Sequence, residues 1–451
     1  MQKGFIFDIN KCTGCNACQI ACSLENDVEF PLNWRQVNTY NPIRYPKIPH
    51  FHLSVACNHC VDPPCMNYCP ALAISKDPVI GTVSIDQNKC IGCQYCSWVC
   101  PYDAPQFNST TRVMEKCTFC SHRLAEDLLP ACVALCPTTA LQFGDIDQSP
   151  IDKIIGFTRS DIKPAIKIYS LNENQQLPEM QELPFDSSIV DSFRQRLLNL
   201  TSKKKITCFS EWPLVLFSLL AAAVISKLTS DILAFNNRSN LLYLIISLSG
   251  LGITTLHLGK IFRSPRAILN WRQSWISREI IFYITFIFLL FAFTFIWHDL
   301  FWLGWLAVIV GFMMLFSIDK IYAVLPTVKA KRIHSANIVL TGLFFTSLFS
   351  GFSFGVIIFG GIKFILYLAR LLNIGDKTRI RLLEGLLRIF CGFIVPASLW
   401  FLQMDFNGWY ASYILIGFAE LIDRCEFYNE LEIITPAKQM VIDLNNQLKY
   451  L

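Results

Sequence analysis

The stretch CTGCNACQIAC at residues 12–22 places four cysteines at the spacing Cys-x2-Cys-x2-Cys-x3-Cys. The same spacing returns in CIGCQYCSWVC at residues 90–100. The residues that lead into each run also repeat, as DINKCTGC at 8–15 and DQNKCIGC at 86–93. Such self-similarity indicates a duplicated structural unit. We therefore expect a small duplicated α+β fold in residues 1–150, with short strands flanking the cysteine runs.

Two further cysteine runs vary this spacing. Residues 57–69 read Cys-x2-Cys-x4-Cys-x3-Cys, and residues 117–136 read Cys-x2-Cys-x11-Cys-x3-Cys. Three closely spaced thiolates can bind three corners of a four-iron cluster, and the fourth cysteine of the run then serves a partner cluster, as in two-cluster ferredoxins. The sixteen ligands expected for four [4Fe-4S] clusters are Cys12, Cys15, Cys18, Cys22, Cys57, Cys60, Cys65, Cys69, Cys90, Cys93, Cys96, Cys100, Cys117, Cys120, Cys132 and Cys136.

Structural zinc and disulfides are the alternatives for so many cysteines. Zinc takes four thiolates in paired Cys-x2-Cys units, and runs of three plus one do not resolve into such pairs. The first residues, MQKGFIFDINKC, show no export signal, so we expect a reducing cytosol, where clustered thiols indicate metal rather than disulfides. The other three cysteines, Cys208, Cys391 and Cys425, lack ligand spacing and are interpreted as ordinary apolar residues.

A lysine stands immediately before the first cysteine of three runs, at Lys11, Lys89 and Lys116. A positive charge near an anionic cluster should raise its reduction potential, because reduction adds negative charge. The alternative is that each lysine is a solvated surface residue beside a short loop. Both interpretations stay open at the level of sequence.

The composition changes sharply along the chain. Residues 151–207 are polar and end in three lysines, which is typical of a linker or flank. From 208 to 426 long apolar runs predict an all-α polytopic membrane domain of about eight helices, followed by a C-terminal tail at 427–451. The expected spans cover approximately residues 210–229, 240–259, 279–298, 300–318, 335–352, 355–372, 386–404 and 408–424. One long or kinked helix is the alternative for the fifth and sixth.

Basic residues divide unevenly between the expected loops. With an even number of spans, fourteen lysines and arginines fall on the side of the N-terminal domain, whereas the other side has little beyond Lys227 and Arg238. The positive-inside rule then places the N-terminal domain on the cytoplasmic side of a bacterial inner membrane. The fourteen are Lys260, Arg263, Arg266, Arg272, Arg278, Lys320, Lys329, Lys331, Arg332, Arg370, Lys377, Arg379, Arg381 and Arg388.

With these four runs in this order, residues 1–150 resemble the iron-sulfur subunit of the dimethyl sulfoxide reductase family of molybdoenzymes. The membrane half resembles the same family's anchor subunit, through LHLG at residues 256–259 and SWISREI at residues 274–280. The resemblance implies that run one pairs with run four and run two with run three. The implied ligand sets are Cys12, Cys15, Cys18 with Cys136; Cys117, Cys120, Cys132 with Cys22; Cys57, Cys60, Cys65 with Cys100; and Cys90, Cys93, Cys96 with Cys69.

The resemblance also implies a function. In this family the anchor oxidises a quinol, menaquinol or ubiquinol, and the clusters pass electrons to a molybdopterin subunit that reduces an S-oxide or N-oxide. The implied partners are therefore that catalytic subunit, the lipid bilayer and the quinol pool, and we expect no nucleic acid. Related nitrate reductases have a Trp where Cys93 stands here, so all four clusters should be four-iron. The chain departs from the family in fusing two subunits that are normally separate.

His257 and Glu279 are ionisable groups at the ends of the second and third expected spans. Quinol oxidation releases two protons with its two electrons, so it needs a hydrogen-bonding base and a route onward, which these residues would supply. Alternatively, His257 bonds between helices, and Glu279 caps its span or pairs with Arg278. Haem bound by histidines is disfavoured, because only His257, His298 and His334 lie in this half, and His298 falls on the far side.

Two other functions remain open. The chain could be the quinone-reducing subunit of a formate or sulfur-compound dehydrogenase, which would reverse the electron flow. It could also be a redox-regulated transporter or sensor. Against the latter, we expect few buried charges in the spans to form an ion path, and sixteen ligands exceed what sensing needs.

Overall fold

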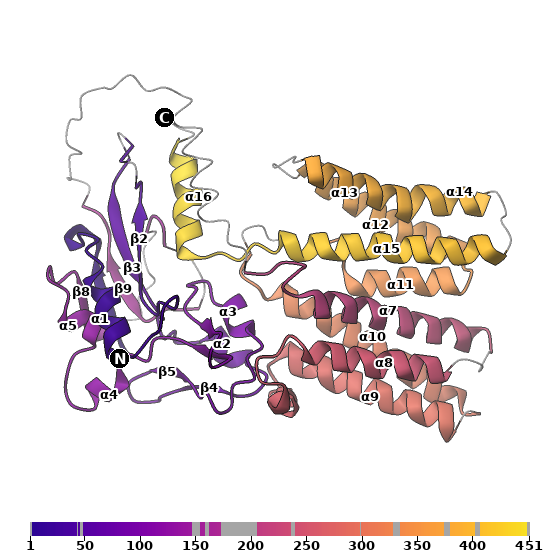
Figure 1. The fold of residues 1–451 in the computed structure, drawn as a ribbon, viewed down its shortest axis with the longest axis horizontal. Coiled ribbons are helices and arrows are strands. Elements are labelled where there is room, and N and C mark those ends of the chain that lie inside the picture. The colour runs from indigo at the N-terminus through magenta and orange to yellow at the C-terminus, as the bar shows by residue number, and fades with distance from the viewer. Residues whose placement is uncertain are drawn as a thin grey trace. The chain divides into compact units, whose positions relative to one another are not determined.

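The computed structural model describes residues 2–42, 44–45, 48–146, 154–157, 162–172, 205–235, 240–297, 299–327, 334–373, 379–401 and 406–448. The chain divides into two compact units (Figure 1). Unit 1 comprises Met1–Lys205 together with Ile433–Leu451, and unit 2 comprises Ile206–Glu432. Most of the linker expected at 151–207 lies outside the described residues, as do His298, Arg238 and several of the basic loop residues.

The main sheet of unit 1 joins the start of the chain to segments far along the sequence. Strand β1 (Gln2–Asp8) pairs antiparallel with β8 (Leu141–Ile146) and parallel with β9 (Ile166–Tyr169), in the order β8-β1-β9. Phe5 and Phe7 face the core, since alternate residues of a strand point to the same side. Because run one follows β1 and run four precedes β8, the sheet holds these two runs together.

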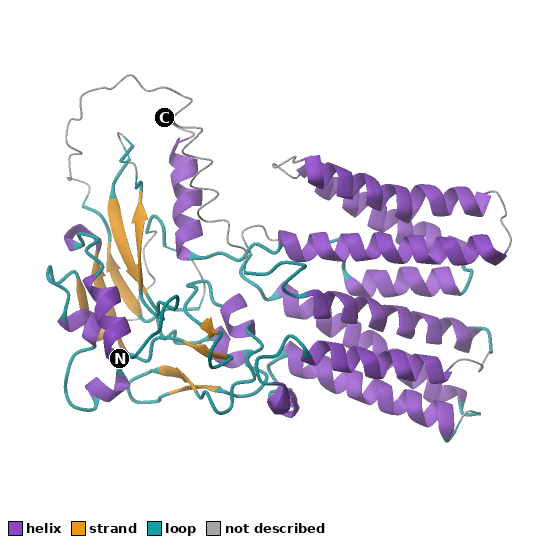
Figure 2. Cartoon of the chain, in the orientation of Figure 1, coloured by secondary structure: helices purple, strands orange, loops and turns teal. Residues whose placement is uncertain are grey.

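Short strands and short helices make up much of unit 1 (Figure 2). The hairpins are β2 (Gln36–Tyr40) with β3 (Phe51–Val55), β4 (Ile74–Lys76) with β5 (Val83–Ile85), and β6 (Gln106–Asn108) with β7 (Val113–Glu115). The helical segments are η1 (Ile9–Lys11), α1 (Ala17–Glu25), α2 (Pro64–Asn67), α3 (Tyr95–Trp98), α4 (Ser121–Leu124) and α5 (Ala131–Ala134). This is the short-strand α+β pattern that the sequence predicts.

The C-terminal helix α16 (Pro436–Leu448) belongs to unit 1 and packs on β2. The Tyr40 hydroxyl donates to Gln447 Oε1 at 2.8 Å, and the Gly156 amide donates to Asp443 Oδ2 at 2.8 Å. Residues 427–451, expected as a tail, therefore do not form a separate segment. Helix α15 continues to Glu430, and the chain from Ile433 onward completes unit 1.

Unit 2 consists of helices that run side by side (Figure 1). Four of its described helices are long and apolar enough to span a membrane: α7 (Trp212–Leu233), α9 (Trp275–Phe295), α10 (Phe301–Ala323) and α12 (Ser353–Asn373). Helices α8 (Asn240–Thr255) and α11 (Ile338–Phe349) are apolar but shorter. The other helical segments are η2 (Ile261–Ile268), α13 (Arg379–Ile389), the π-helical η3 (Phe390–Ile394), α14 (Val395–Phe401) and α15 (Phe406–Glu430).

The apolar stretch around Gly351 is two helices rather than one long or kinked helix. Helix α11 ends at Phe349 and α12 begins at Ser353, and the two pack against each other. Gly351 joins them with a φ of 68°, a left-handed conformation that a residue without a side chain adopts at no steric cost. This turn separates the fifth and sixth helices that the sequence predicts.

Candidate iron-sulfur and quinol sites

The repeated cysteine loops fold in the same way, as their sequences predict. In run one, Gly14 and Asn16 have φ values of 70° and 61°, and in run three, Gly92 and Gln94 have φ values of 71° and 58°. In both runs a helix begins at the residue after the second left-handed position, α1 in the first and α3 in the second. Successive left-handed residues turn the loop tightly, so its cysteines curve around one volume.

Two of the cysteine sets line cavities in unit 1. One cavity is lined by Cys57, Cys60, Cys65 and Cys100, and another by Cys69, Cys90, Cys93 and Cys96. The second cavity has apolar walls that include Ile85 and Met114. Backbone amides point at its sulfurs, since Gly92 and Met114 donate to Cys90 Sγ at 3.4 and 3.5 Å, and Ala73 donates to Cys69 Sγ at 3.4 Å.

The remaining eight cysteines also form two sets, and in each set the fourth cysteine comes from another run. Cys12 lies within electrostatic reach of Cys18, Cys136 and Cys15. Cys22 lies close to Cys132 and Cys120, and Cys117 close to Cys22 and Cys132. The Asn26 amide donates to Cys120 Sγ at 3.7 Å and to Cys22 Sγ at 4.0 Å. The structure thus brings together the four sets that the resemblance implies, each with its fourth cysteine from another run.

The donor sets fit iron-sulfur clusters. Each set contains thiols alone. The two cavities have mainly apolar walls, and backbone N–H groups donate to the sulfurs of Cys69 and Cys90, which are surroundings that stabilise an anionic cluster. Burial raises the pKa of Cys22 to about 12 and that of Cys100 to about 11, so the free thiols stay protonated at neutral pH. Loading a cluster must therefore displace protons from these cysteines, and the bound cluster would supply one-electron transfer.

The three lysines that precede cysteine runs have different surroundings. Lys11 and Lys89 are half-exposed, and each pairs with the aspartate three residues earlier, Asp8 and Asp86. Lys116 is 3% exposed, and its Nζ donates to the carbonyls of Val83 and Cys117. Lys116 alone of the three is therefore a buried charge beside two cysteine sets.

Burial opposes the charge on Lys116, but the thiolates of Cys57 and Cys65 hold its pKa above the usual lysine range. A second buried cation, Arg35, lies just before β2 and is 1% exposed. No sequence motif marks Arg35, because it stands between runs one and two in the chain. Its position near the cysteines arises only when the β2–β3 hairpin folds.

His257 and Glu279 lie at the facing ends of α8 and α9 in unit 2. His257 Nδ1 bonds to the Thr254 carbonyl, so Nδ1 carries the proton and Nε2 is left as the basic nitrogen. The Glu279 carboxyl lies within electrostatic reach of the Arg424 guanidinium on α15. Arg278 does not pair with Glu279, since its guanidinium donates to the carbonyls of Trp271 and Arg272.

The two candidate quinol residues do not share one depth. Helices α8 and α9 touch where the Tyr283 hydroxyl donates to the Ser247 carbonyl at 2.8 Å. Glu279 precedes Tyr283 by four residues, and Thr255, the last residue of α8, follows Ser247 by eight. At ~1.5 Å per residue the end of α8 therefore lies roughly 6 Å beyond Glu279 along the helix axes, and His257 follows that end. A quinone ring, not a direct hydrogen bond, would have to join them.

Haem ligation finds no support at His334. Its Nδ1 accepts from the Ala336 amide at 2.9 Å, and its Nε2 lies 2.8 Å from Arg370 Nη1. Both ring nitrogens are therefore engaged within the protein. His298, the third histidine of this half, lies outside the described residues.

Unit 2 contains a large buried ion network, so the expectation of few buried charges is wrong. Glu420 pairs with Lys363 Nζ and with Arg388 Nη2, each at 2.9 Å. Asp423 pairs with Arg370 Nη1 at 2.9 Å, and Arg370 also binds Glu426 and Glu430. These groups come from α12, α13 and α15, so the network ties three helices together. Because each of these carboxylates is paired with a cation, the network suits a structural tie between helices better than a proton path.

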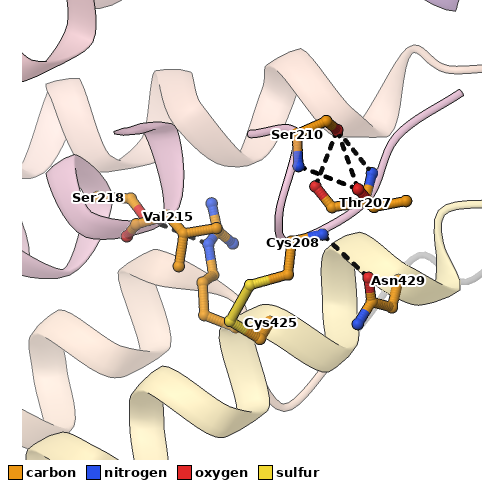
Figure 3. Close-up of a disulfide and its surroundings, with 8 residues drawn as sticks. Thr207, Cys208, Ser210, Val215, Ser218, Cys425 and Asn429 are labelled. Atoms are coloured by element: carbon orange, nitrogen blue, oxygen red, sulfur yellow. Dashed lines mark hydrogen bonds between the residues drawn. A yellow bond between two sulfur atoms is a disulfide. The ribbon is translucent and has the colours of Figure 1, made fainter. Parts of the chain in front are cut away.

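Two cysteines interpreted from the sequence as ordinary apolar residues form a disulfide (Figure 3). Cys208, just before α7, is bonded to Cys425 on α15, across 217 residues of sequence. The Cys208 amide also donates to Asn429 Oδ1 at 2.9 Å. The bond therefore joins the first and last helices of unit 2, and nothing in the spacing of these cysteines predicts the pairing.

Crossed sets of thiols in a short-strand α+β unit define an iron-sulfur electron-transfer protein, and a family model described as a 4Fe-4S dicluster domain matches residues 48–146. One of the chains of the anaerobic dimethyl sulfoxide reductase of Escherichia coli (strain K12) is 41% identical over 155 residues, which cover 33% of this protein and 75% of that relative. The protein belongs to the family of these iron-sulfur subunits.

Other relatives serve different sulfur compounds. Thiosulfate reductase electron transfer subunit PhsB of Salmonella typhi is 40% identical over 158 residues, which cover 34% of this protein and 82% of the relative. A subunit of the sulfite dehydrogenase of Allochromatium vinosum is 36% identical over 166 residues, which cover 32% of this protein and 69% of the relative. The relatives are therefore electron-transfer subunits of oxidoreductase complexes.

Proposed function

We propose that this chain oxidises a membrane quinol and passes the electrons through four [4Fe-4S] clusters to a molybdopterin subunit that reduces an S-oxide or N-oxide. One observation carries the proposal: a single chain combines four crossed sets of four thiols with a unit of apolar helices. An electron carrier that is covalently part of a membrane unit is suited to a lipid-soluble donor. The donor would be menaquinol or ubiquinol.

The proposed quinol site lies between the end of α8 and the start of α9. His257 Nε2 is the unprotonated nitrogen, so it can accept a hydrogen bond and then a proton from one quinol hydroxyl. Glu279, which lies deeper along the helix axes, can accept the second proton. Two acceptors at different depths could serve the two hydroxyls, which stand at opposite ends of a quinol ring.

Reduction of the clusters by a quinol analogue tests this site. His257→Ala should slow cluster reduction and weaken binding of a quinone-site inhibitor, because the hydrogen bond to the ring is lost. Glu279→Gln should retain binding better than turnover, because it keeps the shape and loses the proton acceptor. Ser249→Ala, which removes an exposed hydroxyl bonded within α8, is the control. If both variants are reduced at the wild-type rate with unchanged cluster content, the quinol site lies elsewhere.

The buried cations favour this direction of electron flow. Lys116 lies beside Cys57, Cys65 and Cys117, and a positive charge there raises the reduction potentials of the adjacent clusters. Higher potentials make the clusters better acceptors for quinol electrons. The tuning role proposed for Lys11 and Lys89 is weaker, since water screens both and an aspartate neutralises each.

The reverse direction is the second candidate, and the relationship to a sulfite dehydrogenase subunit favours it. In that case the clusters would deliver electrons to a quinone. Redox titration discriminates the two, since clusters that accept electrons from a quinol need potentials near or above that of the quinol pool. Purification with the partner chain, followed by pterin analysis, identifies the catalytic subunit.

We further propose that unit 2 crosses a bacterial inner membrane about eight times. Unit 1 is built from segments that precede and follow unit 2, so residues 206–432 leave and return on one side, which requires an even number of spans. The basic loops favour a cytoplasmic unit 1, although Arg370 and Arg388 of that set are buried in ion pairs and do not count as loop charges.

The disulfide favours the opposite orientation. Cys208 stands close to the start of unit 2 and Cys425 close to its end, so the bond lies at the end of unit 2 where the chain enters and leaves it, and disulfides persist in oxidising compartments. Reporter fusions at Asn236 and at Asp405 decide between the two. Periplasmic readings at both positions support a cytoplasmic unit 1, and cytoplasmic readings invert the topology.

A further inference from the structure

Arg35 is a buried cation without a carboxylate partner among the described residues. Its side chain is 1% exposed, and its guanidinium carbon lies 4.3 Å from the centre of the Phe5 ring. Nη1 donates to the Ser54 hydroxyl at 3.1 Å, whereas Nε and Nη2 have no hydrogen-bond partner in the part of the chain that the structure describes. A charge buried in this way is costly unless an anion compensates it.

Sulfur atoms are the groups that surround this charge. The cysteine sulfurs within electrostatic reach of Arg35 are those of Cys132, Cys18, Cys117 and Cys22, which carry negative charge as ligands of a cluster. The contact with Cys18 is also made through a hydrogen-bond relay, because Ser54 Oγ lies 3.4 Å from Cys18 Sγ. The compensating anion is therefore the sulfur side of the proposed clusters.

These four sulfurs belong to two different sets. Cys18 stands in the set with Cys12, Cys15 and Cys136, whereas Cys132, Cys117 and Cys22 stand in the neighbouring set. We propose that Arg35 is a single cation shared by these two adjacent clusters, which raises both reduction potentials and offsets the repulsion between their charges. This inference rests on the four-cluster arrangement of the proposed function.

The shared position predicts a distinctive pattern. Two anionic clusters side by side repel, so reducing one disfavours reducing the other. A positive charge between them stabilises the added electron at either site. Removing that charge should therefore move two clusters together and leave the other two, those of Cys57 and Cys90, unaffected.

The test is a redox titration of the anaerobically purified full chain, followed by electron paramagnetic resonance and using chemical mediators rather than quinol. Arg35→Gln should lower the equilibrium constant for reduction of two of the four clusters by at least tenfold. For a one-electron couple this is a fall of 59 mV in reduction potential. Arg35→Lys, which keeps the charge, should restore most of this shift. Lys89→Gln, a change of a half-exposed lysine beside Cys90, is the matched control and should move no cluster by a comparable amount.

Ser54→Ala removes the hydroxyl that links Arg35 to Cys18 and keeps the charge of Arg35. This variant also tests the proposal if Arg35→Gln fails to fold. It should shift the cluster of Cys18 alone, since the hydroxyl reaches only that sulfur. A shift of one cluster in Arg35→Gln, or an equal shift of all four, overturns the shared role. Fewer than four clusters in the wild-type chain would instead refute the proposed function. Wild-type clusters that quinol cannot reduce, with the paired shift intact, would refute the quinol role and leave this inference standing.

Discussion

The buried ion network of unit 2 predicts a large loss of stability from one conservative substitution. Glu420 is 2% exposed and pairs with Lys363 and Arg388, and the Thr341 hydroxyl donates to it at 3.2 Å. Glu420→Gln keeps the shape of the side chain and removes its charge. Arg388 retains Asp423 at 3.4 Å, whereas Lys363, which is fully buried, keeps no carboxylate at ion-pair distance among the described residues.

The size of the stability loss follows from the one charge that loses its ion-pair partner, that of Lys363. Breaking one buried ion pair by removing a partner costs about 3–5 kcal/mol. For a unit of this size each kcal/mol lowers the melting temperature by about 2–4 °C, so Glu420→Gln should lower it by roughly 6–20 °C. The measurement is thermal unfolding of the purified chain in detergent, followed by circular dichroism of its helices.

Removing the charge of Lys363 as well should restore stability. Lys363→Met combined with Glu420→Gln should recover much of the loss, because no unpaired charge then remains buried. Glu384→Gln makes the same chemical change on α13, where no ion pair joins the carboxylate in the described residues, and should change little. A loss of one kcal/mol should already lower the melting temperature by about 2 °C or more. If Glu420→Gln melts within about 2 °C of the wild type, the network does not tie these helices together.

Three further predictions concern composition and covalent structure. The anaerobically purified chain should contain about sixteen irons and no zinc, and metal analysis that finds stoichiometric zinc or about eight irons contradicts the four-cluster arrangement. Cys93→Ser should convert one cluster to a three-iron form and leave the other three, whereas loss of all four resonance signals would mean that unit 1 fails to fold. In cells, Cys208 and Cys425 should not react with a maleimide reagent until the disulfide is reduced. In Cys208→Ser, Cys425 should react without reduction. Labelling of both cysteines in the untreated wild type would mean that the disulfide does not form.

The sequence predicts best what is carried by local spacing. The cysteine runs and their duplicated lead-in residues indicate the loops around Gly14 and Gly92, which fold alike because both need left-handed residues at matching positions. The short strands next to the runs are also predicted, since β1, β4, β5 and β8 coincide with the apolar stretches beside the cysteines. In each case, the signal lies within a few residues of the feature.

Features that join distant residues escape prediction from one sequence. Lys363 and Glu420 stand 57 residues apart, and each looks like an isolated charge near an apolar run. Cys208 and Cys425 have no spacing that marks a disulfide, and Arg35 belongs to no motif. Their partners are set by how the helices and the β2–β3 hairpin pack, which depends on the whole fold rather than on local pattern.

The docking of α16 on β2 has a consequence for the order of assembly. Unit 1 is discontinuous in sequence, so the ribosome completes its last element only after all of unit 2 has been made. The bonds from Gln447 to Tyr40 and from Asp443 to Gly156 can form only in a chain whose last helix has returned to the side where synthesis began. In the topology proposed above, a chain that inserts an odd number of helices would place α16 on the other side of the bilayer from β2, and these two bonds could not form. Completion of unit 1 thus reports on correct insertion of the membrane half.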